Sequence, residues 1–256
     1  MNINKFRDTE LTNDLEKEEP FYRQLIKKRN APSNAFCNLG IICAETGRAD
    51  EAVSFFKKYI ELEPSSSIAY NNLALIFIKQ KKYNEAIKNF LIALKFEQKS
   101  KTYFNLALTY EEIGKEKKAI YNYKEALKID SKNAEALCNL GNLYYISGDL
   151  EEAKQCLEQS IKNKPTLDAA LNNLGLINMA YGDFKAAKKK FIDILKINPL
   201  NSKAHYNLSN LLNYNINGKQ HSSHLLLNLK LSKSEYDKMY YCFALGKVYE
   251  DRKKYK

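Results

Sequence analysis

An asparagine recurs at one position of six similar segments along the chain. The six residues are Asn38, Asn72, Asn105, Asn139, Asn173 and Asn207. A carboxamide offers two N–H donors and an oxygen acceptor without charge, so a row of amides suits the backbone of an extended peptide. Alternatively, each amide bonds to neighbouring backbone of its own chain and contacts no ligand. The sequence leaves both interpretations open.

The asparagines belong to a longer repeating unit, in which Ala134 is taken as position 1. The residue after each asparagine is leucine, and a small residue follows it: Gly40, Ala74, Ala107, Gly141, Gly175 and Ser209. Position 20 is alanine and position 24 is bulky in five copies. Each unit carries two apolar stripes of helical period, which predicts two helices that approach closely at positions 8 and 20. Four copies place a glycine between the stripes, where it suits a left-handed helix end: Gly47, Gly114, Gly148 and Gly182.

This pattern resembles the tetratricopeptide repeat (TPR), a helix–turn–helix unit of about 34 residues. The resemblance implies an all-α fold, a TPR solenoid that winds as a right-handed superhelix and lines a concave groove with the first helix of each repeat. It covers five repeats well. These are expected at residues 33–66, 67–99, 100–133, 134–167 and 168–201.

The sequence therefore predicts four parts. They are a polar N-terminus with a capping helix at 1–32, five repeats at 33–201, a degenerate sixth repeat at 202–238 and the first helix of a truncated seventh repeat at 239–256. An unfinished repeat leaves an apolar face uncovered. Either the native protein continues beyond this chain, or another subunit covers the face by end-to-end association.

Local signals set the expected helix boundaries outside the regular repeats. Pro20 fits only the first turn of a helix, so the capping helix is expected to begin at about Glu19. Ser232 and Glu235 have the spacing of a capping box that opens the last helix. In that helix Gly246 falls at position 8 of the seventh copy.

TPR domains are protein-binding modules, so the resemblance implies a scaffold that holds an extended peptide in its groove. The predicted peptide-binding residues are Asn38, Asn72, Asn105, Asn139, Asn142, Asn173, Lys203 and Asn207. Asn142, Asn173 and Lys203 also match positions of TPR domains that clamp a C-terminal carboxylate. Cys138 and Asn207 stand where that clamp has a lysine and an arginine, which argues against a chaperone-tail clamp.

A second resemblance gives an alternative function. HYNLSNLL, followed after a degenerate stretch by FALGKVYEDRKKY, looks like the segment before the catalytic domain of bacterial TPR–sulfotransferase proteins. It implies a substrate-recruiting arm of a larger sulfotransferase, whose catalytic domain and phosphoadenosine phosphosulfate site lie outside this chain. The chain itself has no phosphate-binding glycine loop, GxSxG or HExxH motif, so we expect neither catalysis nor a cofactor.

The charge and the composition argue against two classes of partner, nucleic acids and membranes. The net charge is +11, and residues 202–256 hold ten Lys/Arg against four Asp/Glu. Only five residues are arginine, and nucleic-acid readers rely on arginine, so no nucleic acid is expected. No apolar run approaches the roughly 20 residues that span a bilayer, and the polar start is not a signal peptide, so we expect no membrane and a cytoplasmic protein. The resemblance to bacterial TPR–sulfotransferase proteins implies a bacterial source.

The cysteines and histidines form no pattern typical of a metal site. The five cysteines are Cys37, Cys43, Cys138, Cys156 and Cys242, with no CxxC pair, and are expected to stay reduced. His221 and His224 are three residues apart without a nearby third ligand, so we expect a solvated pair. His205 occupies the bulky position 4 of its repeat, and we expect it to be packed.

Overall fold

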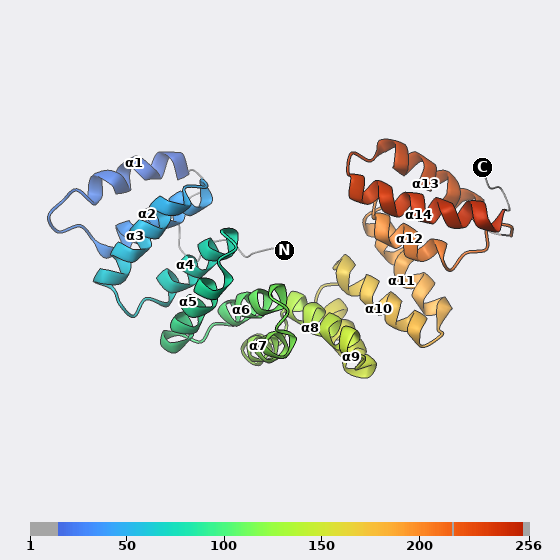
Figure 1. The fold of residues 1–256 in the computed structure, drawn as a ribbon, viewed down its shortest axis with the longest axis horizontal. Coiled ribbons are helices and arrows are strands. Elements are labelled where there is room, and N and C mark those ends of the chain that lie inside the picture. The colour runs from blue at the N-terminus through green and yellow to red at the C-terminus, as the bar shows by residue number, and fades with distance from the viewer. Residues whose placement is uncertain (1–14, 217, 253–256) are drawn as a thin grey trace. The chain divides into compact units, whose positions relative to one another are not determined.

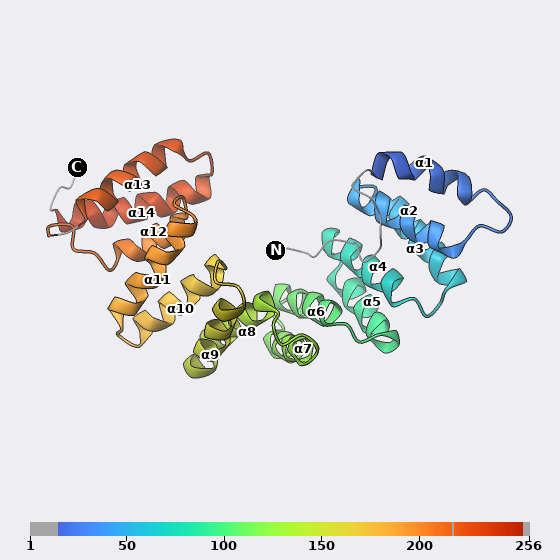
Figure 2. The ribbon, with the colours of Figure 1, turned by 180° about the vertical axis from the view of Figure 1, so that it is seen from behind.

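The computed structural model describes residues 15–216 and 218–252, and within them it contains fourteen helices and no strand (Figures 1 and 2). The first seven helices are α1 Leu15–Leu25, α2 Ser33–Glu45, α3 Ala49–Leu62, α4 Ser67–Lys79, α5 Tyr83–Phe96, α6 Ser100–Glu112 and α7 Glu116–Ile129. The others are α8 Ala134–Ser147, α9 Leu150–Asn163, α10 Asp168–Ala180, α11 Phe184–Ile197, α12 Ser202–Ser209, α13 Lys219–Leu231 and α14 Glu235–Asp251. The all-α fold class is confirmed. The right-handed superhelix stays a prediction.

Helices α2 to α11 pack as five consecutive helix–turn–helix pairs, as the repeat predicts. A short turn joins the helices of each pair. Four of these turns contain a glycine with positive φ: Gly47 (+82°), Gly114 (+69°), Gly148 (+87°) and Gly182 (+79°). The second repeat has Lys81 with a φ of +58° instead, a conformation that a residue with a Cβ adopts at a steric cost.

Close packing between the paired helices confirms the register. A Cβ added at Gly40 would lie 2.8 Å from the Phe56 ring, and one at Gly175 would lie 2.6 Å from the Phe191 ring. The position-20 alanines across the pairs have no exposed surface: Ala52, Ala86, Ala119, Ala153 and Ala187. Small residues at positions 8 and 20 therefore bring the helices together around the bulky residue at position 24.

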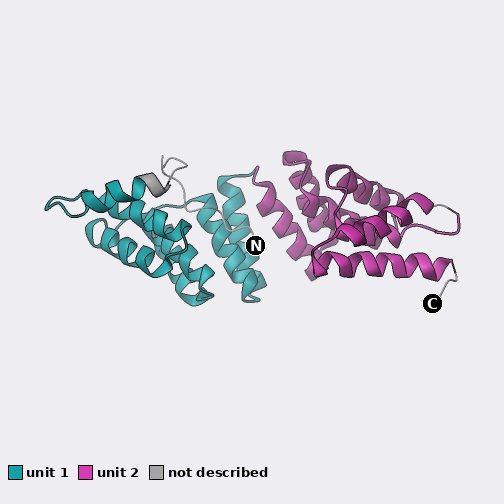
Figure 3. Ribbon diagram, turned by 90° about the horizontal axis from the view of Figure 1, so that it is seen from above, with its two compact units in different colours: residues 1–131 teal, residues 132–256 magenta. Residues whose placement is uncertain are grey.

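The chain divides into two compact units, which are described separately (Figure 3). Unit 1 ends at Ser131 and contains α1 to α7; unit 2 begins at Lys132 and contains α8 to α14. In unit 1, α1 packs against α2, and its role as a capping helix stays a prediction. The predicted start was wrong, however, because α1 begins at Leu15 and Pro20 lies inside it. Pro20 has no backbone N–H, so the helix lacks the hydrogen bond to the carbonyl oxygen four residues earlier.

An ion-pair network attaches α1 to the first repeat. Both carboxylate oxygens of Glu19 accept hydrogen bonds of 2.6 Å from the Arg48 guanidinium. Arg23 Nε donates to the same carboxylate at 2.7 Å, and its Nη2 donates to Glu51 at 2.5 Å. The two arginines lower the pKa of Glu19 to about 2, with the hydrogen bond from Arg48 as the largest cause.

Unit 2 ends in an irregular three-helix cluster. Helix α12 is short, and α14 packs against both α12 and α13. Its core contains Tyr214, Leu225, Tyr241, Ala244, Leu245 and Val248. Gly246 has open space where its Cβ would be, in contrast to the position-8 glycines of the complete repeats. The covering of this face by another subunit stays a prediction.

The cap of α14 differs from the expected one. The Ser234 hydroxyl, rather than that of Ser232, accepts the hydrogen bond from the backbone N–H of Asp237. Ser232 Oγ instead accepts a bond of 3.3 Å from the N–H of Ser234, in the loop that precedes the helix. The predicted capping box at Ser232 and Glu235 was therefore wrong, because Ser234 and Asp237 have the same spacing two residues later.

Candidate peptide-binding face

Four asparagine side chains of unit 2 form a connected series of hydrogen bonds. Nδ2 of Asn207 donates to Oδ1 of Asn172 at 2.7 Å, and Nδ2 of Asn172 donates to Oδ1 of Asn173 at 3.4 Å. Nδ2 of Asn173 then donates to Oδ1 of Asn142 at 3.4 Å. We call these four residues the amide run. Each donor uses one of its two N–H groups, so the run keeps hydrogen-bonding capacity for a ligand.

The repeat positions the amide run. Its members come from the first helices α8, α10 and α12, at positions 5, 6 and 9 of their repeats. The adjacent position-7 leucines, Leu140, Leu174 and Leu208, are 4–5% exposed and fix the opposite side of each helix in the core. The four amides are half-buried, which keeps them ordered but within reach of a ligand.

The asparagine column of unit 1 lies in a different environment. Asn72 is 2% exposed and Asn105 is 1% exposed. Nδ2 of Asn72 and both polar atoms of the Asn105 side chain are buried and make no hydrogen bond to the described residues. A ligand would reach these two amides only if the groups above them moved. Asn38 is half-buried, so it is the most accessible of the three.

Asn139, which the sequence places in the same column, is half-buried on α8. The hydrogen-bonded run reaches α8 through Asn142 instead, one turn further along the helix. The equal spacing of six asparagines therefore did not predict six equivalent amides. Of the predicted peptide-binding residues, the structure connects Asn142, Asn173 and Asn207, and it adds Asn172.

An aromatic patch adjoins the amide run on α12 and α14. It consists of Tyr206, Tyr236, Tyr240 and Phe243. The ring of Tyr206 lies 5.8 Å from that of Tyr240 and 6.1 Å from that of Phe243, centre to centre, and Tyr236 and Tyr240 lie 5.1 Å apart. Tyr236 and Phe243 are 53% and 55% exposed. Such large, exposed rings are typical of binding surfaces.

Lys203 lies against this patch. Its Nζ is 5.4 Å from the centre of the Tyr236 ring and 6.0 Å from that of Tyr240, within the range of a cation–π contact. A hydrogen bond between Lys203 and Tyr236 raises the pKa of Lys203 and lowers the pKa of Tyr236. The lysine is therefore fully charged at neutral pH.

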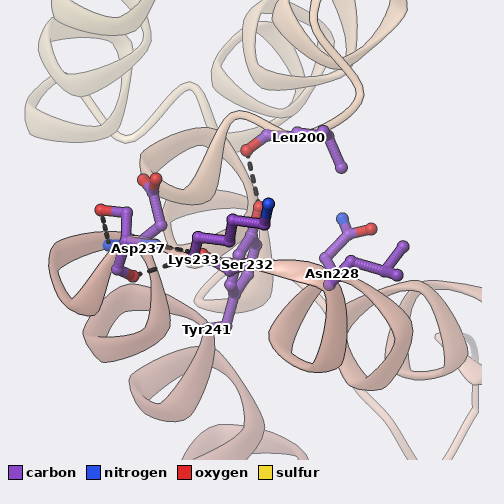
Figure 4. A pocket seen from close by; sticks show the side chains of 8 residues that line it. Leu200, Asn228, Ser232, Lys233, Asp237 and Tyr241 are labelled. Atoms are coloured by element: carbon purple, nitrogen blue, oxygen red, sulfur yellow. Dashed lines mark hydrogen bonds between the residues drawn. The ribbon is translucent and has the colours of Figure 1, made fainter.

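Two open pockets lie along the loops that flank α12 and α14, and one of them adjoins Lys203. The first, of about 340 Å³, is lined by Asn198, Leu200, Asn201, Ser202, Lys203, Tyr236 and Asp237. The second, of about 300 Å³, shares Leu200 and Asp237 with it, and Figure 4 shows this pocket. The hydroxyl of Tyr241 donates to the backbone oxygen of Leu200 at 2.6 Å and fixes the wall between the loop and α14.

Sequence reasoning missed the three aromatic residues on α14. Tyr240 and Phe243 fall at positions 2 and 5 of the seventh copy, where Lys203 and Tyr206 stand in the sixth. The register set by Gly246 was therefore a signal that could have found them. Tyr236 precedes position 1 and has no counterpart in the pattern.

The histidine prediction was wrong for His221. His221 is half-buried and bonds to two side chains, whereas His224 is exposed. Burial lowers the pKa of His221 to about 3. The prediction failed because the folded loop brings Tyr214 and His205 to both sides of the ring. His205 is packed as expected, with 3% exposure.

Comparison with known families identifies the repeats. Four tetratricopeptide-repeat models match residues 33–66, 55–88, 112–148 and 134–167. The chain therefore contains tetratricopeptide repeats at these residues. TPR repeats form scaffolds for protein–protein interaction, and no catalytic family was found.

Relatives and solved structures support the same fold. The chain is 29% identical to anaphase-promoting complex subunit 3 of Schizosaccharomyces pombe over 87 residues, which cover 34% of this chain and 13% of that protein's length. Among solved structures, the TPR protein YrrB is 19% identical, with a TM-score of 0.61, over 72% of this chain and 95% of YrrB. PilF of Pseudomonas aeruginosa is 18% identical, with a TM-score of 0.69, over 81% of this chain and 95% of PilF.

None of the helices within 15–216 and 218–252 combines the length and the apolar character that a bilayer crossing needs. The same residues contain no group of three or more His, Cys, Asp or Glu side chains placed to hold a metal ion.

Proposed function

We propose that the amide run and the aromatic patch of this TPR protein bind an extended segment of a partner protein. The observation that carries the proposal is the continuous amide run from α12 to α8 through Asn207, Asn172, Asn173 and Asn142. Neutral amides match the alternating N–H and C=O groups of an extended backbone without selecting a charge. The adjoining rings supply the apolar contacts that give a peptide affinity.

The dimensions of the face suit a short segment. Taking about 9 Å between successive helices of the face as an order of magnitude, the three steps from α8 to α14 span about 27 Å. An extended chain advances about 3.3 Å per residue, so roughly eight residues cross the whole face.

The known proteins add limited support. YrrB is described as a TPR protein with an unusual peptide-binding site, and we propose the same class of ligand here. The short match to a subunit of the anaphase-promoting complex agrees with a role in assembling proteins. None of the relatives reported above is a sulfotransferase, so the recruiting-arm alternative gains no support and is not proposed.

Selection of peptides by the full chain tests the proposal. A bead library of random peptides of about twelve residues, long enough to exceed the face, is screened with labelled protein. Selected peptides are then titrated by fluorescence anisotropy against the wild type and the double variant Asn173→Ala/Asn207→Ala. We expect at least about tenfold weaker binding by the double variant, because the peptide loses its contacts with two half-buried amides of the run.

A matched control separates the face from the rest of the surface. Asn84→Ala removes an exposed amide from the second helix α5 and should leave peptide affinity unchanged. Circular dichroism melts establish that each variant is folded. The proposal fails if no peptide is selected, or if the selected peptides bind the double variant as tightly as the wild type.

A further inference from the structure

The surroundings of Lys203 specify the ligand further. We propose that the bound segment carries an acidic side chain in its interior, which pairs with Lys203, beside an apolar side chain that packs on Tyr206 and Phe243. This inference rests on the proposed function and names the chemistry of its partner: an extended acidic–apolar peptide segment.

Lys203 is an exposed cation without an anionic partner. Its ammonium contacts the rings of Tyr236 and Tyr240, and among the described residues no carboxylate lies within ion-pair distance of it. The nearest acid lining the same pocket, Asp237, accepts a hydrogen bond of 2.6 Å from the Ser202 hydroxyl. A bound carboxylate would therefore give this ammonium its ion pair, with tyrosine hydroxyls around it as further donors.

The charge of the face favours the same ligand. The amide run is neutral, so Lys203 provides the charge along this row of side chains. Residues 202–256 hold ten Lys/Arg and four Asp/Glu, so this part of the chain has a net positive charge and a positive long-range field. An acidic segment is attracted by this field, whereas a basic segment is repelled.

The place of Lys203 favours a side chain over a chain terminus as its partner. Lys203 lies on α12, with the amides of α10 on one side and the rings of α14 on the other. A segment that ended at Lys203 would leave one of these two surfaces unused. A segment that crosses both surfaces passes Lys203 with its interior, so the charge must come from Asp or Glu.

Strand geometry sets the spacing of the two side chains. In an extended segment, residues two apart point to the same side and lie about 6.6 Å from each other. The centre of the Tyr240 ring lies 6.0 Å from Lys203 Nζ and 5.8 Å from the ring centre of Tyr206, which in turn lies 6.1 Å from that of Phe243. An acidic residue at Lys203 therefore places the apolar residue two positions away over Tyr240, at the edge of the Tyr206 and Phe243 rings.

The test uses the full chain and synthetic peptides with acetylated and amidated ends, so that no terminal carboxylate is present, and the same peptides with a free C-terminal carboxylate for comparison. Selected sequences are compared for Asp and Glu two positions from an aromatic or aliphatic residue. Titrations by anisotropy then compare the wild type with Lys203→Met and Lys203→Glu. Lys154→Met is the matched control, because Lys154 also lies near a tyrosine ring, that of Tyr181 at 5.9 Å, but on the second helix α9.

We expect the acidic–apolar pattern to be enriched and Lys203→Met to weaken binding about fivefold, as for an ion pair at a partly shielded site. Lys203→Glu should weaken it further, and replacement of the peptide acid by lysine should restore binding to this variant. Affinity should fall as salt is added. Lys154→Met should bind like the wild type.

Other results would overturn this inference, and they also show whether the proposed peptide site fails with it. If selected peptides lack the acid and bind Lys203→Glu normally, but bind Asn173→Ala/Asn207→Ala weakly, the acidic ligand is wrong and the peptide site stands. If peptides bind only when their C-terminal carboxylate is unblocked, the interior position is wrong. If the amide double variant also binds normally, both proposals fail.

Discussion

Nε2 of His221 lies 2.9 Å from Nδ1 of His205 in unit 2. The backbone oxygen of Pro199, which only accepts, lies 2.9 Å from Nε2 of His205. His205 therefore carries its proton on Nε2 and accepts on Nδ1 from His221. Nδ1 of His221 in turn accepts from the Tyr214 hydroxyl at 2.6 Å. This chain of hydrogen bonds requires both rings to be neutral.

The histidine chain predicts a loss of stability in weak acid. Burial lowers the pKa of both histidines, that of His221 to about 3, whereas an unfolded histidine titrates near 6.5. Between these values the unfolded state binds more protons, so stability is complete above about pH 6.5 and falls below it. At pH 5 His221 should cost about 2 kcal/mol of unfolding free energy, and His205 should add to this loss, measured by urea denaturation at pH 5 and pH 7.5.

Two histidine variants test whether this loss of stability comes from the hydrogen-bonded histidines. The glutamine in His221→Gln does not titrate, so this variant should reduce the stability difference between the two pH values, even if it lowers stability at both. The exposed His224 provides the control, and His224→Gln should keep the wild-type difference. An unchanged pH dependence in His221→Gln would contradict the assignment.

The network of Glu19 predicts that α1 detaches locally at low pH. Its lowered pKa, about 2, means that its contribution is complete above about pH 4.5 and is lost as the pH falls below that value. Glu19→Gln should lower the free energy of local opening of α1 by about 1–2 kcal/mol at neutral pH, which is measured as faster hydrogen exchange in α1. Glu61→Gln removes a carboxylate from the exposed Lys58–Glu61 pair and should leave exchange in α1 unchanged.

Two glycines at position 8 should respond to alanine in opposite directions. A Cβ at Gly141 would lie 2.9 Å from Leu157 Cγ and 3.1 Å from the Ala153 oxygen, so Gly141→Ala should destabilise by about 1–3 kcal/mol. Gly246 has open space there, so Gly246→Ala should stabilise by about 0.5–1 kcal/mol through helix propensity. Thermal melts of both variants provide the measurement, and destabilisation by Gly246→Ala would indicate that this face is covered in solution.

The backbone conformation of Lys81 predicts that a substitution there stabilises the second repeat. Its φ of +58° is the left-handed conformation that glycine adopts in the equivalent turns of four other repeats. Lys81→Gly relieves the steric cost of the Cβ and should stabilise by about 0.5–1 kcal/mol after the added flexibility of the unfolded chain is subtracted. Lys88→Gly, at an exposed position inside α5, should destabilise instead, and urea unfolding distinguishes the two.

The repeat pattern predicted the architecture because each repeated residue reports a contact inside one helix pair. Gly40 against Phe56 and Gly175 against Phe191 are close approaches between residues 16 apart, so the sequence spacing determines them. Helix ends outside the pattern were less predictable. Pro20 entered the interior of α1, because tertiary contacts offset the loss of one backbone bond.

The candidate site was only partly predictable, because its members depend on contacts between repeats. The asparagine column is uniform in sequence, yet Asn105 is buried while Asn207 bonds to Asn172 on the neighbouring repeat. Burial of a side chain depends on the residues that cover it, which differ from copy to copy. Tyr236 and His221 acquire their surroundings from an irregular loop and the packing of α14, which no periodicity describes.

The amide run of unit 2 also has a direction. Each side chain donates its nitrogen to the oxygen of the next, from Asn207 through Asn172 and Asn173 to Asn142. The carboxamide dipoles therefore add head to tail, and the two ends of the row differ: an acceptor oxygen at α12 and donor hydrogens at α8. A polypeptide also runs from amine to carboxyl end. Its forward and reversed threading along this row are consequently unequal in energy, and a reversed-sequence peptide would not be an equivalent ligand.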